Sequence, residues 1–180
     1  MSAELAAFVD SNVLVYAVSD DEPAKQRRAR EIVARGFAEG CFSISTQVML
    51  EVYVSITRKA RVGLPPSEAL DYVRAFAEWP VVDMTPELVV AALGLAQRAK
   101  ISPWDAAILE AARQAGCRHL LSEDLADGQS YGGVSVLPTT FFLDRDGKLI
   151  AREFGLQSRS VFVDHIKKAL SQGQAVQAQK

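Results

Sequence analysis

Cysteine and histidine are scarce in this sequence of 180 residues, which contains two of each. Cys41 and Cys117 lie far apart and form no Cys-x-x-Cys spacing, so a structural zinc site and a thioredoxin-type redox pair are excluded. We interpret both as buried thiols in a reducing compartment. Because His119 and His165 are the only histidines, a Ser/His/Asp triad and a histidine-rich metal site are also disfavoured.

Long hydrophobic runs are missing as well, although 49% of the residues are apolar. No run is long enough to span a bilayer. The first four residues lack the positive flank and apolar segment of a secretory signal. We therefore expect a cytoplasmic protein with no membrane partner. At this length the apolar content suffices for one sizeable core, so one domain with a small appendage is the expectation.

The sequence has no excess of basic charge, because its formal net charge is −2 and its pI is near 5.7. A general electrostatic binder of nucleic acid is normally basic, so non-specific coating of DNA or RNA is disfavoured. A nuclease remains compatible with this balance, since clustered active-site acids lower the net charge while they bind metal ions.

Short apolar segments alternate with helical segments along most of the chain. Strands are expected at residues 5–9, 41–45, 81–82, 119–121 and 134–137. Helices are expected at residues 13–18, 22–35, 46–61, 67–79, 85–100 and 102–115. This alternation predicts an α/β fold with a central parallel sheet.

Four acidic residues stand at informative positions in this pattern. Asp10 follows the first strand and Asp124 follows the fourth, at the carboxyl ends where α/β folds bind their ligands. Glu51 lies in a helix that is apolar nearly all the way round, so we expect this helix to be largely buried. Asp105 lies in a second apolar helix. A buried, unpaired carboxylate is costly, so each needs a compensating partner.

Each of these acids also has a plain structural explanation. Asp10 could cap the next helix, Asp124 could be a solvated loop acid, and Glu51 could pair with an arginine. Asp105 could complete a capping box with Ser102. As a set, however, they form an all-oxygen group without competing histidine or cysteine, which selects Mg²⁺ or Mn²⁺. Such ions serve phosphodiester hydrolysis, so the pattern predicts a metal-assisted phosphoryl hydrolase.

The short motifs around the four acids resemble those of PIN domains, and they occur in the same order. They are FVDSNVL at 8–14, STQVMLE at 45–51, SPWDAAI at 102–108 and LLSEDL at 120–125, followed by Gly128. The resemblance covers residues 5–137. It implies a three-layer α/β/α fold, with a central parallel sheet, in a nuclease domain at residues 1–137.

The resemblance to PIN domains also implies an activity, a cofactor and partners. The activity is that of a divalent-metal-dependent endoribonuclease, a hydrolase that cuts RNA, most often the VapC-like toxin of a toxin–antitoxin pair. Asn12 and Ser122 would orient the acids, and Asp127 is a further loop acid. A homodimer and a silencing antitoxin protein are expected. Mg²⁺ (or Mn²⁺) would be held by the catalytic acids Asp10, Glu51, Asp105 and Asp124.

Basic and aromatic residues have a simpler interpretation. Two groups of basic residues could contact an RNA backbone, but they could equally lie on the solvent-facing sides of helices without binding RNA. Trp79 and Trp104 are expected in the core rather than as stacking platforms for bases. The basic groups are Lys25, Arg27, Arg28 and Arg30, and then Arg58, Lys59 and Arg61.

Residues 138–180 continue past the end of a usual PIN domain. Residues 138–150 predict two strands joined by an Asp-Arg-Asp-Gly turn, and residues 161–170 predict an amphipathic helix. This C-terminal β-hairpin and helix resembles the end of a thioredoxin-like domain. The first half of that fold and its cysteine pair are missing, so redox activity is not implied.

The main alternative to a nuclease is a catalytically silent PIN-fold module that binds RNA or protein. A phosphatase or a DNA nuclease with a similar acidic cleft is a further alternative. The sequence leaves the RNA target and the antitoxin open.

Overall fold

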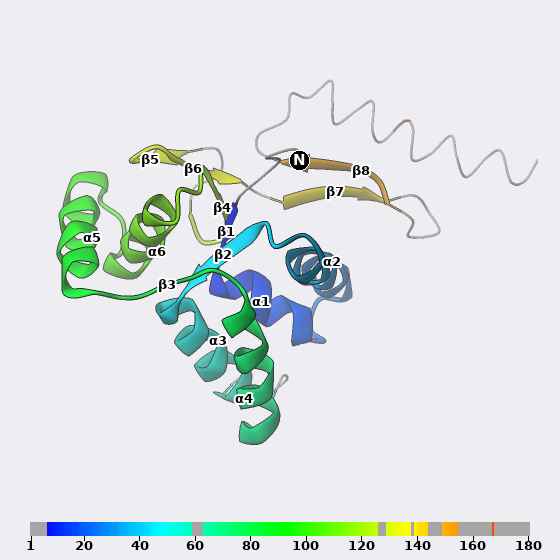
Figure 1. Cartoon of the computed structure of the whole chain (residues 1–180). Coiled ribbons are helices and arrows are strands. Elements are labelled where there is room, and N and C mark those ends of the chain that lie inside the picture. Colours follow the sequence, from blue (N-terminus) through cyan, green and yellow to red (C-terminus); the bar gives the residue numbers. More distant parts are fainter. Residues whose placement is uncertain are drawn as a thin grey trace, which may run out of the picture.

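The computed structural model of the chain describes residues 7–58, 63–125, 129–137, 139–143, 149–154 and 167. A six-stranded sheet of order β3-β2-β1-β4-β6-β5 forms its centre (Figure 1). All neighbouring strands are parallel except β5, which runs antiparallel to β6. The strands are β1 (Ala7–Val9), β2 (Phe42–Ser45), β3 (Val81–Val82), β4 (His119–Leu121), β5 (Ser130–Tyr131) and β6 (Val134–Leu137).

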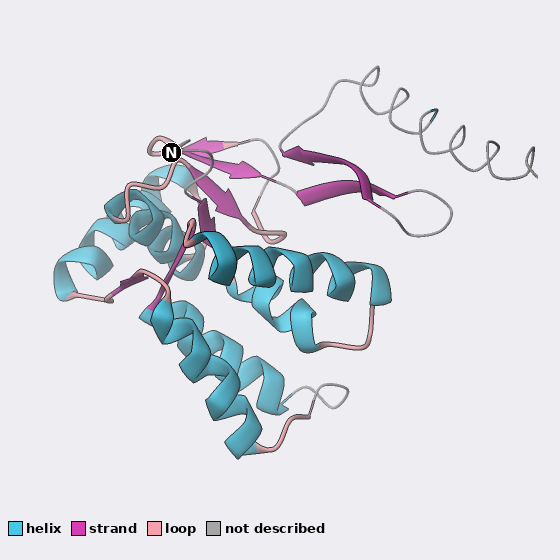
Figure 2. Ribbon diagram, turned by 45° about the vertical axis from the view of Figure 1, so that its right-hand side comes forward, coloured by secondary structure: helices cyan, strands magenta, loops and turns pink. Residues whose placement is uncertain are grey.

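Helices cover both faces of this sheet (Figures 1 and 2). The chain runs from β1 outward to β3 and then returns to β4, so right-handed crossovers place the helices on opposite faces. Helices α1 to α4 cover one face and α5 and α6 the other, which is the expected three-layer α/β/α fold. The helices are α1 (Ser11–Val18), α2 (Pro23–Glu39), α3 (Thr46–Arg58), α4 (Pro66–Ala75), the 3₁₀ turn η1 (Phe76–Glu78), α5 (Pro86–Ala99) and α6 (Pro103–Gln114).

The core lies along the central strands, where no residue of β1 or β2 is exposed on either face. A strand with helices on both sides must bury both rows of side chains, which explains the continuous apolar runs in the sequence. The predicted strands are present, and their carboxyl ends meet at one edge of the sheet. One strand was missed. β5 pairs with β6 across Gly132 and Gly133, whose φ angles of 57° and 91° favour glycine in a tight hairpin turn.

Several helix boundaries differ from the sequence prediction, and α1, for example, begins at Ser11 rather than at residue 13. Helix α4 begins at Pro66 with Pro65 before it, one residue before the predicted start at residue 67. Proline is well suited to the first helical position, because its missing N–H has no partner there anyway. Helix α2 continues through Gly36 to Glu39 and ends at Gly40, whose φ is 60°.

The prediction that the helix at 46–61 is largely buried was wrong. Helix α3 has a buried stripe of Val48, Val52 and Ile56, but Leu50 is 69% exposed and Val54 is 41% exposed. Only one stripe of a helix can face the sheet, so apolar residues outside it remain on the surface. This surface is contiguous with the candidate site described below.

The C-terminal segment contains the two predicted strands, whereas the predicted Asp-Arg-Asp-Gly turn between them lies outside the described residues. β7 (Thr139–Leu143) pairs antiparallel with β8 (Leu149–Phe154) as a separate two-stranded sheet. The helix predicted at 161–170 lies outside the described residues except for Lys167, which is helical and exposed. The similarity to a thioredoxin-like domain remains a prediction. In the described ranges, no helix combines the length and apolarity that a bilayer crossing requires.

An aromatic cluster joins α2 to the end of α4. Trp79 is 5% exposed, as expected for a core residue, and its ring lies 5.3 Å from Phe37, 5.9 Å from Phe42 and 5.1 Å from Phe76 between centroids. Gly36 allows this close packing, because a Cβ atom there would lie 2.2 Å from Cζ2 of Trp79.

We predict that Gly36→Ala destabilises the protein. Alanine favours a helix over glycine by about 1 kcal/mol, but the clash with the indole ring costs about 1–3 kcal/mol and outweighs that gain. Urea unfolding monitored by tryptophan fluorescence measures the difference. Gly94→Ala on α5 is the control, since its nearest neighbour is the flexible end of Arg98 at 3.2 Å. Equal unfolding midpoints for both variants would contradict the packing argument.

Candidate active site

Asp10 is the most buried acid of the candidate site, with 3% of its surface exposed. It follows β1, caps α1, and its backbone N–H donates to Leu121 O of β4 at 3.0 Å. Oδ1 accepts from the Ser11 N–H at 2.6 Å, and Oδ2 accepts from Ser122 Oγ at 2.6 Å. Asn12 Nδ2 also donates to Oδ2 at 3.3 Å. The Asp10 side chain therefore caps α1 and also takes part in the polar network of the candidate site.

The environment of Asp10 raises its pKa to about 6. Burial of the carboxyl group is the largest cause, and the negative charges of Asp124 and Glu51 add to it. Hydrogen bonds from Ser122 and from the Ser11 backbone act in the opposite direction and lower the pKa. The site thus holds a carboxylate whose negative charge is poorly stabilised by the protein alone.

Glu51 lies on α3 and is half-buried. Its Oε2 accepts from Ser11 Oγ at 2.8 Å and its Oε1 from Gln47 Nε2 at 2.8 Å. The expectation of a deeply buried glutamate was too strong, since one side of α3 faces solvent. In the described part of the chain its hydrogen-bond partners are neutral, so the buried pair with an arginine is not the arrangement found. Ser11 connects Glu51 to Asp10.

Asp124 lies on the loop after β4 and is exposed. Its N–H donates to Ser122 Oγ at 3.2 Å, and its Oδ2 accepts from Asn12 Nδ2 at 3.2 Å. Asn12 therefore donates to the carboxylates of both Asp10 and Asp124. The Asn12 Oδ1 atom is buried and has no hydrogen-bond partner among the described residues. An acceptor oxygen without a partner beside two carboxylates is a suitable place for a cation or its bound water.

Asp105 is placed less directly. It is the third residue of α6, its N–H donates to the capping Ser102 Oγ at 3.1 Å, and its side chain is half-buried. No described hydrogen bond joins its carboxylate to the other three acids. Gln47 links its neighbourhood to the site, because Gln47 Nε2 donates both to Glu51 and to Trp104 O at 3.2 Å.

The structure thus joins Asp10, Glu51 and Asp124 through short polar side chains, whereas no described hydrogen bond links the Asp105 carboxylate to them. Across the described ranges, no three acidic, histidine or cysteine side chains converge on one point in a manner that could hold an ion. Asp127 lies outside the described residues. Ser11 and Gln47 were missed as functional candidates, although Gln47 lies four residues before Glu51, a spacing that places both on one helix face.

Trp104 is 67% exposed, so its assignment to the core was wrong. It lies beside Glu51, Gln47 and Ser11 in a cavity of about 580 Å³. The apolar part of this cavity continues to α5, because Met84 and Trp104 also line the adjoining groove with Val89 and Leu93. We define the apolar surface as the exposed residues Leu50, Val54, Val89, Val90, Leu93 and Trp104.

The basic residues have mixed environments. Lys25 forms ion pairs with Glu22 at 3.1 Å and with Glu123 at 3.0 Å. Arg30 Nε donates to Ala17 O at 2.9 Å. Lys59 and Arg61 lie outside the described residues. Lys25 and Arg30 therefore have intramolecular partners, which agrees with a structural interpretation better than with open RNA contacts.

Comparison with known proteins identifies the fold. The profile described as PIN domain matches residues 7–126. The chain is similar to Mycobacterium tuberculosis VapC20, a sarcin–ricin loop cleaving toxin, with 18% identity, a TM-score of 0.55, and coverage of 66% of this chain and 89% of that one. A Klebsiella pneumoniae toxin–antitoxin complex gives 18% identity, a TM-score of 0.52 and coverage of 73% and 96%. DNA-bound VapBC from Salmonella typhimurium gives 16% identity and a TM-score of 0.51, with coverage of 73% of this chain and 96% of that one. No curated protein sequence matches significantly.

We predict that Asp10 makes the protein less stable as the pH rises. The pKa of Asp10 is raised from 3.8 to about 6 by folding, so the folded state retains a proton that the unfolded chain has lost. The free energy of unfolding therefore falls between about pH 4 and 6, by at most on the order of 3 kcal/mol. Asp10→Asn removes this fall, whereas any change in hydrogen bonding shifts stability equally at every pH.

Urea unfolding between pH 4 and 8 in EDTA measures this difference. Asp71→Asn is the control, because the Asp71 side chain is 71% exposed on α4 and should leave the pH dependence of the wild type unchanged. Parallel pH profiles for wild type and Asp10→Asn would show that the buried carboxylate is not the cause.

Proposed function

The chain belongs to the PIN-domain family, and on that premise we propose that it is an endoribonuclease dependent on a divalent metal ion. The reaction is hydrolysis of RNA phosphodiester bonds. The observation that supports it most strongly is the buried Asp10 carboxylate, which Ser11 and Ser122 connect to Glu51 and to the Asp124 loop. A fold that needs only a helix cap at this position has no reason to gather further negative charge around a buried acid.

Mg²⁺ or Mn²⁺ is the cofactor that this donor set fits. The donors are carboxylate and amide oxygens, which hard cations prefer, and the Asn12 Oδ1 acceptor has no partner in the part of the chain that the structure describes. A cation would also offset the burial of the carboxylate and, to a lesser degree, the repulsion by Asp124 and Glu51, which together raise the pKa of Asp10. When bound, such an ion activates water and neutralises charge on the phosphate. The residues proposed to hold it are Asp10, Glu51, Asp105 and Asp124.

The surrounding polar side chains have a supporting role in this proposal. Ser122 holds Asp10 Oδ2 and also accepts from the Asp124 N–H, so one hydroxyl group orients two acids. Asn12 donates to both of these acids from the other side. Gln47 holds Glu51 and the start of α6 together. Hydrogen bonds of this kind restrict the carboxylate rotamers before a cation or substrate arrives.

We further propose that the protein is the toxin of a toxin–antitoxin pair and acts in the cytoplasm. The support is the fold shared with VapC20 and with the toxin–antitoxin structures, together with the PIN-domain match. An antitoxin protein is the corresponding partner. A homodimer is the other expected assembly, and the apolar surface on α3, α5 and Trp104 supports association with a second copy.

A catalytically silent PIN module is the second candidate. The observation that favours it is the arrangement of the acids, which turn toward serine, asparagine and glutamine side chains rather than toward one common point in the described ranges. Such a module would keep the polar network for stability alone. Metal binding and RNA cleavage distinguish it from the nuclease.

We predict that the purified full chain cuts RNA in Mg²⁺ or Mn²⁺ and not in EDTA. Asp10→Asn, Glu51→Gln, Asp105→Asn and Asp124→Asn should each lower the cleavage rate at least about 100-fold, because each removes one negative charge from the proposed site. A panel of structured RNAs analysed on denaturing gels measures the rates. Calorimetric titration with Mn²⁺ provides a readout that does not require the correct RNA.

Asp71→Asn is the matched control, since it makes the same chemical change on the exposed surface of α4 and should retain full activity. Mn²⁺ binding by wild type that is lost in Asp10→Asn supports the site even when no RNA of the panel is cut. Absence of both binding and cutting in antitoxin-free, folded protein would favour the silent module.

We also predict that the chain is a dimer in solution. Leu93→Glu, at a residue of α5 that is 46% exposed, should produce monomers because it places a charge in the apolar surface. Light scattering coupled to size exclusion measures the mass, and circular dichroism checks that the variant is folded. A wild-type monomer at all concentrations would remove the support that this surface gives to self-association.

A further inference from the structure

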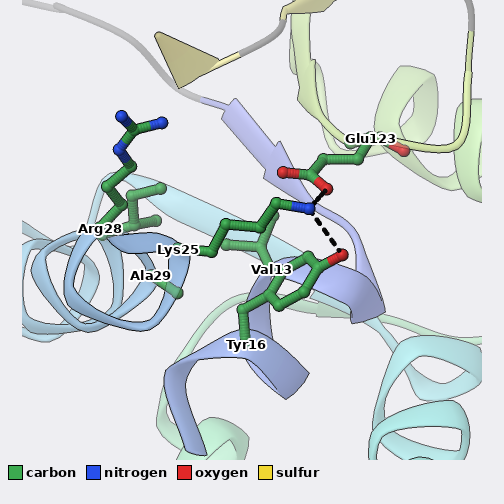
Figure 3. A pocket seen from close by; sticks show the side chains of 8 residues that line it. Val13, Tyr16, Lys25, Arg28, Ala29 and Glu123 are labelled. Carbon is green, nitrogen blue, oxygen red and sulfur yellow. Dashed lines mark hydrogen bonds and ion pairs between the residues drawn. The ribbon is translucent and has the colours of Figure 1, made fainter. Parts of the chain in front are cut away.

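Lys25 of α2 contacts α1 and the loop after β4 beside the acidic site (Figure 3). Its Nζ donates to Glu123 Oε2 at 3.0 Å and to the Tyr16 hydroxyl at 3.2 Å, and it lies 4.6 Å from the centre of the Tyr16 ring. It also pairs with Glu22 at 3.1 Å. Lys25 therefore connects α2, the α1 helix that carries Tyr16, and the loop that carries Glu123.

Glu123 lies between two residues of the candidate site. On one side Ser122 donates to Asp10, and on the other side Asp124 accepts from Asn12. Glu123 itself lines the small pocket between α1 and α2, where Lys25 binds its carboxylate (Figure 3). An interaction that holds the Glu123 side chain in this pocket also limits how its two neighbours can rotate.

We propose that Lys25 is a positioning residue, which fixes the 122–124 loop through Glu123 so that Ser122 and Asp124 face Asp10 and Asn12. This inference rests on the proposed function only in that the fixed acids are the proposed metal ligands. Lys25 itself touches neither the acids of the site nor a reacting group. Its effect passes through the backbone of the loop.

The strength of the ion pair does not explain its role. The side chains of Lys25 and Glu123 are 31% and 47% exposed, and ion pairs at such positions contribute little to global stability. The geometry is more constrained than the exposure suggests, because the Tyr16 hydroxyl and ring fix the ammonium group from a second element. The contact therefore adds a restraint on the 122–124 loop rather than stabilising the whole fold.

Simple electrostatics predicts the opposite effect on metal binding. A lysine near an acidic site repels a divalent cation, so removing its charge should tighten binding of Mn²⁺ if Lys25 acts only through its field. If Lys25 positions the loop, removing it should weaken binding, because Ser122 and Asp124 lose their orientation. The sign of the change separates the two explanations.

The experiment is calorimetric titration of the full chain with Mn²⁺. Lys25→Met should weaken binding about 5- to 20-fold, as is typical when a group that orients metal ligands is lost. Lys25→Arg keeps a positively charged side chain, so its affinity for Mn²⁺ should stay within about twofold of wild type. Arg74→Met breaks a comparable surface pair with Asp71 on α4 and serves as the control with unchanged affinity. Unchanged or tighter binding in Lys25→Met would overturn the proposal.

The double variant tests whether Lys25 acts through Glu123. Glu123→Gln alone should also weaken Mn²⁺ binding, and Lys25→Met combined with Glu123→Gln should be no weaker than the weaker single variant. Independent, multiplying losses would mean that the two residues do not act as one unit, and the proposal would fail.

Hydrogen exchange provides a readout without metal. The Asp124 N–H is held by Ser122 Oγ at 3.2 Å, so its exchange should become several-fold faster in Lys25→Met and remain unchanged in Arg74→Met. Should the wild type bind no Mn²⁺, unchanged exchange in Lys25→Met would overturn the positioning role by itself. Metal binding without RNA cleavage would instead count against the proposed function and leave this inference standing.

Discussion

A carboxylate at the end of a buried central strand needs partners, and the surroundings of Asp10 are arranged around that need. The residue is 3% exposed, and its oxygens accept hydrogen bonds from the α1 N-terminus, from Ser122 after β4 and from Asn12. These bonds connect two neighbouring parallel strands and the first helix. They do not fully stabilise the charge, because burial and two nearby acids still raise the pKa of Asp10 to about 6. A fold that retains this conflict has an acidic centre suited to a cation.

The rest of the candidate site extends outward from Asp10 in two directions. Ser11 leads to Glu51 on α3, and Asn12 with Ser122 leads to Asp124 on the loop after β4. Lys25 of α2 holds this loop through its contact with Glu123. Beyond Glu51 the surface changes in character, since Leu50, Val54 and Trp104 are exposed and apolar. An acidic centre therefore borders the apolar surface that supports association with a second copy.

The sequence allowed much of this to be predicted, but it failed where burial depends on neighbours. The alternation of strands and helices, the parallel sheet and the acids at strand ends follow from local patterns. The burial of α3 and of Trp104 was predicted wrongly, because apolar composition does not say which stripe of a helix meets the sheet. The helix predicted to begin at residue 67 begins at Pro66, because proline is well suited to the first helical position. Gln47 was overlooked, since a glutamine in an apolar helix carries no signal until its partners are known.

The sequence by itself determined the fold class and the identity of the acids, because side-chain periodicity and the order of the motifs are properties of the chain alone. It also excluded a Cys-x-x-Cys redox pair and disfavoured a histidine-rich metal site, because the chain has two cysteines and two histidines. Only the tertiary structure decided how the acids are connected. Residues separated by 40 and 112 positions, Ser11 with Glu51 and Asn12 with Asp124, meet within 3.2 Å because parallel strands bring their carboxyl ends to one edge of the sheet. The same packing left Trp104 on the surface and placed Lys25 against Glu123, and neither outcome is encoded in local sequence.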